Sequence, residues 1–113
     1  MKPTEKHLLM SWRLRRIPNG FGWIDHRVLR DGIMRQCTTD ALALYVVLIL
    51  AADKEGISYY GNRLLCSLLG VSMGRLESAR ENLIHADLIA WEAPLYQVLE
   101  ISEVGKEAHE DER

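Results

Sequence analysis

Cysteine is scarce in this chain of 113 residues, where only Cys37 and Cys66 occur, far apart in the sequence. Two isolated cysteines exclude the dense disulfide framework of small secreted domains, and residues 1–10 are too poor in apolar residues for a secretory signal. A long apolar run is also lacking, because the longest, residues 41–52, has twelve residues and is too short to span a bilayer. We therefore expect free thiols, a reducing cytoplasm and no membrane partner.

Residues of the kind that enzymes and metal sites use are present only singly. The four histidines and two cysteines lack the spacing of metal ligands. Asp25, His26 and Cys37 show no spacing to a partner that would activate a nucleophile, and the chain has no glycine-rich phosphate loop. The sequence therefore predicts a protein that is not an enzyme and that holds no metal and no cofactor.

A strong net charge is missing as well, since the formal net charge is −2. Residues 1–36 carry eight Lys and Arg against three acidic residues, whereas residues 37–102 carry four against eight. Residues 103–113 carry two against five and have no apolar period, so we predict a charged, disordered tail there. Because nucleic-acid binders are usually basic overall, such binding cannot be argued here from bulk charge.

The clearest element that is present is a helix over residues 41–54. Thr38, Thr39 and Asp40 form a polar start signal before it. This helix is apolar on nearly all sides, so it must be covered on more than one face. We expect the N-terminal segment to supply the main cover, with a dimer contact as an open addition. The covering side chains would be Trp12, Phe21, Trp23, and Val28 and Leu29 of a short helix that Asp25 caps and Gly32 closes.

Two short helices with a tight turn between them are predicted over residues 62–88. Asn62 is the expected N-cap of the first helix, whose apolar face we assign to Leu64, Leu65, Leu68 and Leu69. Gly70 is expected to end this helix in a left-handed conformation, and Ser72 to cap the second. The apolar residues of the second helix are Met73, Leu76, Ala79, Leu83 and Ile84.

Short strands surround this helix pair. Residues 57–60 read as one strand, and residues 88–91 and 95–101 read as a hairpin around Glu92, Ala93 and Pro94. The fold class that follows is mainly α with a small antiparallel β-sheet (α+β).

The pattern over residues 39–101 resembles the winged helix-turn-helix, the DNA-binding domain of many bacterial regulators and of replication and mobile-element proteins. In that family a small residue lies where the two helices cross, as Cys66 does, and a Gly usually precedes the final Leu-Ile, where this chain has Asp87. The residues that carry the resemblance are Asn62, Leu65, Cys66, Leu69, Gly70, Val71, Ser72, Leu76, Ala79, Leu83, Leu88 and Ile89.

Three parts are expected in the chain. Residues 1–36 form a basic N-terminal arm and a short helix that pack on the core, residues 37–102 form the winged helix-turn-helix domain, and residues 103–113 form the tail. Two interpretations of the arm stay open: it could follow a phosphate backbone or the minor groove, or it could be a solvated edge whose tryptophans fill the core.

A DNA-reading function, implied by the resemblance, would place the second helix in the major groove. On this reading Ser72 and the first turn hold a phosphate, Arg75 reads guanine, and Asn82 reads adenine. The predicted DNA-binding residues are Asn62, Arg63, Ser72, Gly74, Arg75, Ser78 and Asn82 of the helix pair, and Arg13, Arg15 and Arg16 of the arm. The protein would act without catalysis on double-stranded DNA, as a transcription regulator or as an accessory factor of replication or transposition.

Some residues favour a different function for the same fold. Glu77 and Glu81 lie toward the exposed side of the second helix and would repel phosphate, and Glu92, Ala93 and Pro94 give the wing tip no positive charge. Arg75 and Arg80 could then simply pair with glutamates on a solvated surface. The alternative is a protein–protein interaction module, possibly a homodimer.

Overall fold

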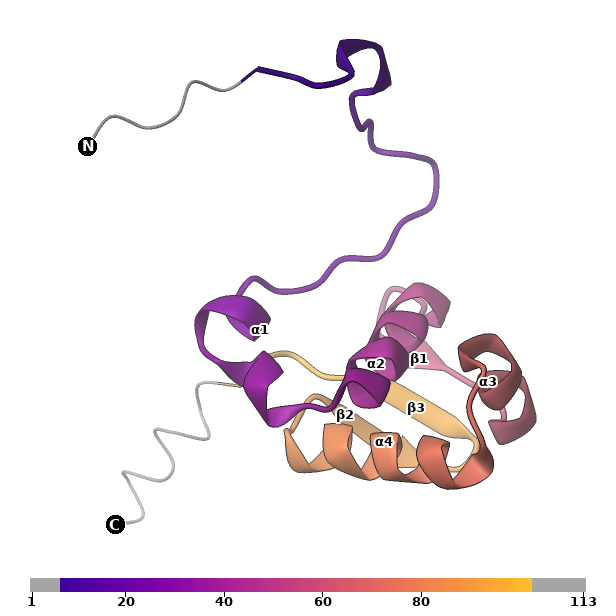
Figure 1. Ribbon diagram of the computed structural model, residues 1–113. Helices are drawn as coiled ribbons and strands as arrows, with labels where there is room; N and C mark the ends of the chain where they lie inside the picture. The colour runs from indigo at the N-terminus through magenta and orange to yellow at the C-terminus, as the bar shows by residue number, and fades with distance from the viewer. Residues whose placement is uncertain (1–6, 103–113) are drawn as a thin grey trace.

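A computed structural model describes residues 7–102 of the chain (Figure 1). The tail predicted over residues 103–113 lies outside the described residues. Helix α2 (Thr39–Ala51) runs through the middle of the domain and packs on α4 (Met73–His85). The Thr38 hydroxyl accepts a hydrogen bond from the Ala41 N–H at 3.0 Å, which confirms the predicted polar start. Among the described residues, no helix has both the length and the apolar composition needed to cross a bilayer.

The turn between α3 (Asn62–Leu69) and α4 has the predicted geometry. Gly70 has a φ of 68°, and its N–H donates to the Cys66 carbonyl at 2.8 Å, which ends α3. The Ser72 hydroxyl then accepts a hydrogen bond from the Arg75 N–H at 3.2 Å and caps α4. Both predictions depended on local chemistry, and both are confirmed.

The predicted role of Asn62 as N-cap of α3 is wrong. Gly61 precedes the helix with extended backbone and Asn62 is its first residue. The Asn62 side-chain carbonyl instead accepts a hydrogen bond from Arg80 at 2.9 Å. A partner on α4 therefore replaces the backbone N–H that a cap would have used.

A three-stranded antiparallel sheet of order β1-β3-β2 completes the domain, and the α+β fold class is confirmed. Strand β1 (Ile57–Ser58) is shorter than predicted, and β2 (Ile89–Glu92) and β3 (Leu95–Val98) form the wing hairpin. Asp87 adopts a φ of 63° before β2, as the position before the final Leu-Ile requires. Tyr96 of β3 is 1% exposed and lies in the core, together with Leu44, Leu48, Leu65, Leu76, Leu83 and Leu88.

We predicted that large side chains of the N-terminal segment cover α2, and this prediction is wrong. Trp12 is 77% exposed, Trp23 75% and Leu29 73%, and Phe21 is also exposed, so of the five predicted residues only Val28 is buried. No strand forms over residues 12–17, where a short 3₁₀ turn, η1 (Ser11–Arg13), leads into extended chain. The prediction failed because burial of an apolar side chain is favourable against any apolar surface, so the sequence does not determine which surface it contacts.

Besides the buried Val28 side chain, the backbone of this segment makes a close contact with α2. A Cβ added to Gly22 would lie 2.7 Å from Cγ2 of Ile49, so the main chain crosses the helix closely at this glycine. The chain then enters α1 (Arg27–Arg30), whose N-cap is His26 and not the predicted Asp25. An Asp25 carboxylate oxygen nevertheless accepts the Arg27 N–H at 2.8 Å. A second 3₁₀ turn, η2 (Ile33–Gln36), follows.

Three apolar residues of the helix pair are more exposed than the sequence pattern predicted. Leu64 and Leu68 of α3 are 44% and 54% exposed, and Met73 of α4 is 44% exposed. Fewer leucines of α3 contact the core than the sequence predicted, because only Leu65 is buried and Leu69 is half-buried.

Candidate functional site

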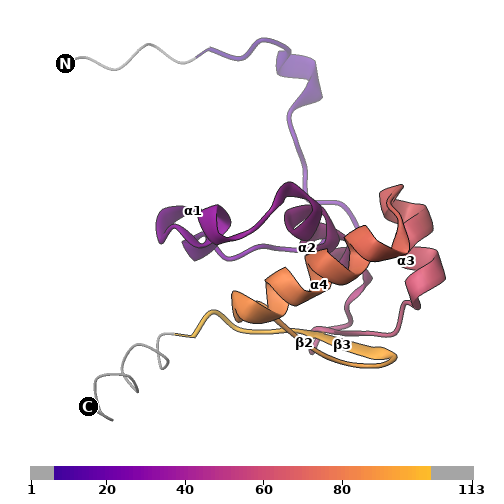
Figure 2. The same ribbon diagram turned by 60° about the horizontal axis from the view of Figure 1, so that its bottom comes forward.

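Helix α4 presents one continuous outward face. Leu76, Ala79 and Leu83 point into the core, which leaves the opposite side to solvent at helical spacing. In Figure 2 this helix passes in front of part of α2, with which it packs. A shallow hollow follows the outward side and is lined by Gly74, Glu77, Ser78, Glu81, Asn82 and His85.

Arg75, a predicted base reader, is paired within the protein. Its guanidinium donates from Nε to Oδ2 of Asp40 at 2.9 Å and from Nη2 to Oδ1 at 2.7 Å. This two-pronged contact lowers the pKa of Asp40 and raises that of Arg75, with the side-chain hydrogen bond as the main cause of both shifts. Since the Arg75 side chain is still 57% exposed, any anion that approaches α4 competes with Asp40 for this guanidinium.

Asn82, the predicted adenine reader, is also used by the fold. Its carbonyl oxygen accepts the Thr38 N–H at 2.7 Å, and its amide donates to the Gln36 carbonyl at 2.9 Å. Asn82 thus fastens α4 to the chain that leads into α2. With both ends of the amide bonded, Asn82 is unsuited to a bidentate contact with a base.

A buried arginine joins the two helices of the pair to the wing. Arg80 is 5% exposed, and its Nη1 donates to Oδ1 of Asn62 at 2.9 Å and to the Tyr96 hydroxyl at 2.8 Å. The guanidinium carbon lies 3.8 Å from the centre of the Trp91 ring, a cation–π geometry. The alternative that Arg80 pairs with glutamates on a solvated surface is therefore wrong, and nothing in the sequence indicated its actual partners, which come from α3, β2 and β3.

The remaining predicted site residues fall into two separate groups. Ser72, Gly74 and Ser78 are exposed on α4, and Arg63 is exposed near the start of α3. The arginines of the arm, Arg13, Arg15 and Arg16, are all exposed on a segment that leaves the domain beyond α2. Figures 1 and 2 both place this segment across α2 from α4, so the structure does not bring the arm to the outward face of α4.

Comparisons with known proteins add one structural likeness. No protein-family model matches the chain, and no curated protein matches it in sequence. The fold is similar to a solved structure described as the structure of a Rep–DNA complex, with a TM-score of 0.55 and 18% identity. The likeness covers 84% of this chain and 90% of the other, and at this identity it shows a shared fold.

Proposed function

We propose that this protein binds double-stranded DNA through its α3–α4 motif, with α4 lying in the major groove. The observation that carries the proposal is the outward face of α4, which is capped at Ser72, free of large side chains at Gly74 and Ser78, and held rigidly by Asp40 and the chain before α2. The similar fold of a Rep protein, solved in complex with DNA, supports this use of the motif.

Gly74, Ser78, the first turn of α4 and Arg63 have distinct roles in this proposal. Gly74 lacks a side chain and has open space around its Cα, which allows close approach of a phosphate or a base edge. The Ser78 hydroxyl can donate to or accept from a base, and the first turn of α4 together with Arg63 contacts phosphates. We place Asn82 and the arm arginines outside the interface, because the first is bonded on both sides and the second lie across α2.

The biological role that fits this interface is non-catalytic, as a transcription regulator or as an accessory factor of replication or transposition. The two free thiols of the described chain fit a reducing cytoplasm.

Fluorescence anisotropy with a labelled duplex of random sequence tests the proposal across a salt series. We expect the association constant to fall linearly with salt on a logarithmic scale, with a slope of about −0.9 for each phosphate contacted. Ser78→Glu adds a negative charge to the outward face of α4 and should weaken binding by about tenfold.

A matched control is Gln97→Glu, which adds the same charge to an exposed position of β3 next to the buried Tyr96. Since neighbouring strand residues face opposite sides of a sheet, Gln97 faces away from the core and should leave affinity nearly unchanged. Absence of binding at about 50 mM salt, or an equal loss in both variants, would rule the proposed interface out.

A further inference from the structure

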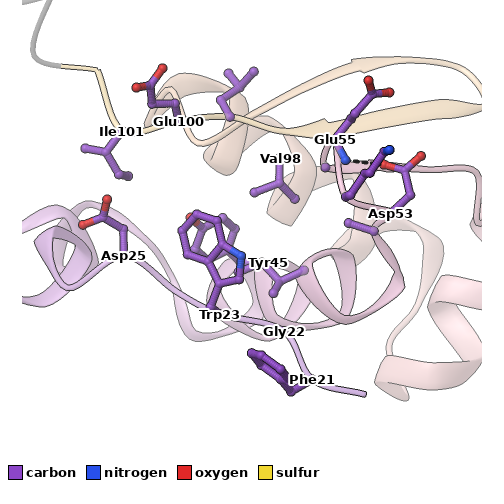
Figure 3. Close-up of a pocket in the computed structure, with 15 residues that line it drawn as sticks. Phe21, Gly22, Trp23, Asp25, Tyr45, Asp53, Glu55, Val98, Glu100 and Ile101 are labelled. Carbon is purple, nitrogen blue, oxygen red and sulfur yellow. Dashed lines mark hydrogen bonds between the residues drawn. The ribbon is translucent and has the colours of Figure 1, made fainter. Parts of the chain in front are cut away.

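A groove lies beside α2, away from the outward face of α4. It encloses about 480 Å³ between residues 21–25, the second half of α2 with residues 52–56 that follow it, and residues 98–101 at the end of β3 and beyond it. Figure 3 shows Trp23 in front of Tyr45, with Asp25 to one side, Val98 and Ile101 toward the strands, and Glu55 and Glu100 at the far edge. The groove therefore has an apolar and aromatic interior and an acidic rim.

Charge along the rim is strongly one-sided. Four acidic residues line the groove, Asp25, Asp53, Glu55 and Glu100, against the single base Lys54. The Arg27 side chain donates hydrogen bonds to Asp25 and lowers its pKa to about 2, so this carboxylate stays ionised but is already paired. Backbone N–H groups of Ile57 and Glu55 lower the pKa of Asp53, which keeps its negative charge. Glu55 and Glu100 are exposed.

Trp23 gives this groove a preference among cations. Trp23 is 75% exposed, although it lies near the Asp25 carboxylate and borders an apolar interior. A tryptophan face favours a guanidinium over other cations, because the planar group stacks on the ring while it pairs with carboxylates. The groove is thus suited to an extended segment that combines arginines with apolar side chains.

The arm of this protein has that composition. Residues 7–20 are exposed throughout, contain no acidic residue and carry Arg13, Arg15 and Arg16. Large apolar side chains alternate with these arginines, and Trp12, Leu14 and Ile17 are 77%, 58% and 82% exposed. Such a run of uncovered apolar residues marks an interaction site.

We propose that residues 11–17 of a second copy of this chain occupy the groove, and that the exchange is mutual, which gives a dimer with two identical contacts. Trp12, Leu14 and Ile17 of the arm would enter the apolar interior, while its arginines would pair with Glu55 and Glu100 and stack on Trp23. The arm heads away from its own domain in Figures 1 and 2, which favours a groove on another molecule over its own. A closed two-fold arrangement is the commonest outcome of such mutual contacts.

Sedimentation velocity with charge-reversed full-length chains tests this proposal. One variant reverses the arm (R13E/R15E/R16E) and another reverses the groove rim (E55K/E100K); all five positions are exposed, and circular dichroism checks that the fold is kept. The wild type should dimerise at micromolar concentration, and each variant should raise the dissociation constant by roughly 30-fold or more, because like charges then face each other. Added salt should weaken the wild-type dimer.

Mixing the two variants is the decisive step. In the mixture the reversed arm meets the reversed rim and the native arm meets the native rim, so both contacts of a heterodimer are attractive. We expect heterodimers in the mixture and restored dimers when one chain carries both sets of changes. Matched controls are R35E and E77K/E81K, which reverse exposed charges outside the groove lining and should leave the dimer intact.

Two results would overturn the proposal. The first is a wild type that stays monomeric up to about 100 µM, roughly tenfold or more above the expected constant. The second is a mixture that stays monomeric, because an arm that folds onto its own groove gains nothing from another chain. DNA binding is measured separately on the same samples, and loss of the dimer does not bear on the outward face of α4.

Discussion

At the scale of single residues, polar side chains on the core side of this domain form hydrogen bonds that connect one element to another. Arg80 connects α4 to Asn62 and to the wing, and Asn82 connects α4 to the chain before α2. A guanidinium that is 5% exposed is stable here because two oxygen acceptors and the Trp91 ring replace water.

Arg80→Ala should lower the free energy of unfolding by about 2–4 kcal/mol, since it leaves the Tyr96 hydroxyl without this donor and creates a cavity under Trp91. Arg80→Lys should lose less, because a charge remains near the ring. Urea denaturation measures both. Arg63→Ala, an exposed arginine of α3, serves as control and should change stability by less than about 0.5 kcal/mol. Equal effects at the two positions would contradict this account of the network.

Arg75→Ala should raise the pKa of Asp40 toward its ordinary value of 3.8, because the guanidinium hydrogen bond causes most of the depression. A lowered pKa stabilises the fold above the unfolded pKa, and this contribution is lost as the pH falls through the folded value. The stability difference between wild type and variant should therefore shrink as the pH falls below 3.8. An NMR titration of the Asp40 carboxyl group gives the pKa, and Arg63→Ala should leave it unchanged.

At the scale of elements, the turn between α3 and α4 could be predicted because its chemistry is local. A glycine at the end of a helix predicts the left-handed turn, and a serine two positions later predicts the cap of the next helix. The opposite holds for Asn62 and Asn82, which looked like a cap and a base reader. Their actual partners, Arg80 and Thr38, are 18 and 44 positions away in the sequence, and no local pattern could predict those contacts.

Gly70→Ala should destabilise the protein by about 1–2 kcal/mol, because a side chain strains the left-handed backbone there. No atom lies within 4 Å of the added Cβ, so the whole effect comes from the backbone. Gly74→Ala is the matched change, also in open space but within α4, and should stabilise by about 0.5–1 kcal/mol. Thermal unfolding measures both, and the same sign at the two positions would contradict the assigned conformations.

At the scale of the whole molecule, the sequence predicted the domain but not the placement of its arm. Periodicity identified the helices and strands, and the apolar character of α2 correctly indicated burial of Leu44 and Leu48. The same reasoning assigned Trp12 and Trp23 to the core, where they are not found. An apolar side chain indicates that a contact exists, but it does not say whether the contact lies within one chain or between two.

The mutual exchange of arms makes thermal stability depend on protein concentration. The melting temperature of the wild type should rise as concentration increases, because association stabilises only the folded chain. The arm-reversed variant R13E/R15E/R16E should melt at a temperature that does not change with concentration. Differential scanning calorimetry over about a hundredfold concentration range makes the comparison, and R35E should behave like the wild type.

The hydrogen bonds that Arg75 and Asn82 make near the start of α2 also limit which residues of α4 can be changed to give this protein a new binding target. Among the outward residues of α4, Arg75 and Asn82 connect the helix to the rest of the domain. The residues that form none of the side-chain hydrogen bonds and ion pairs described here are Gly74, Glu77, Ser78, Glu81 and His85. A combinatorial library that randomises those five and keeps Arg75 and Asn82 should therefore yield mostly folded variants, while one that also varies the two anchors should lose most of its members to instability.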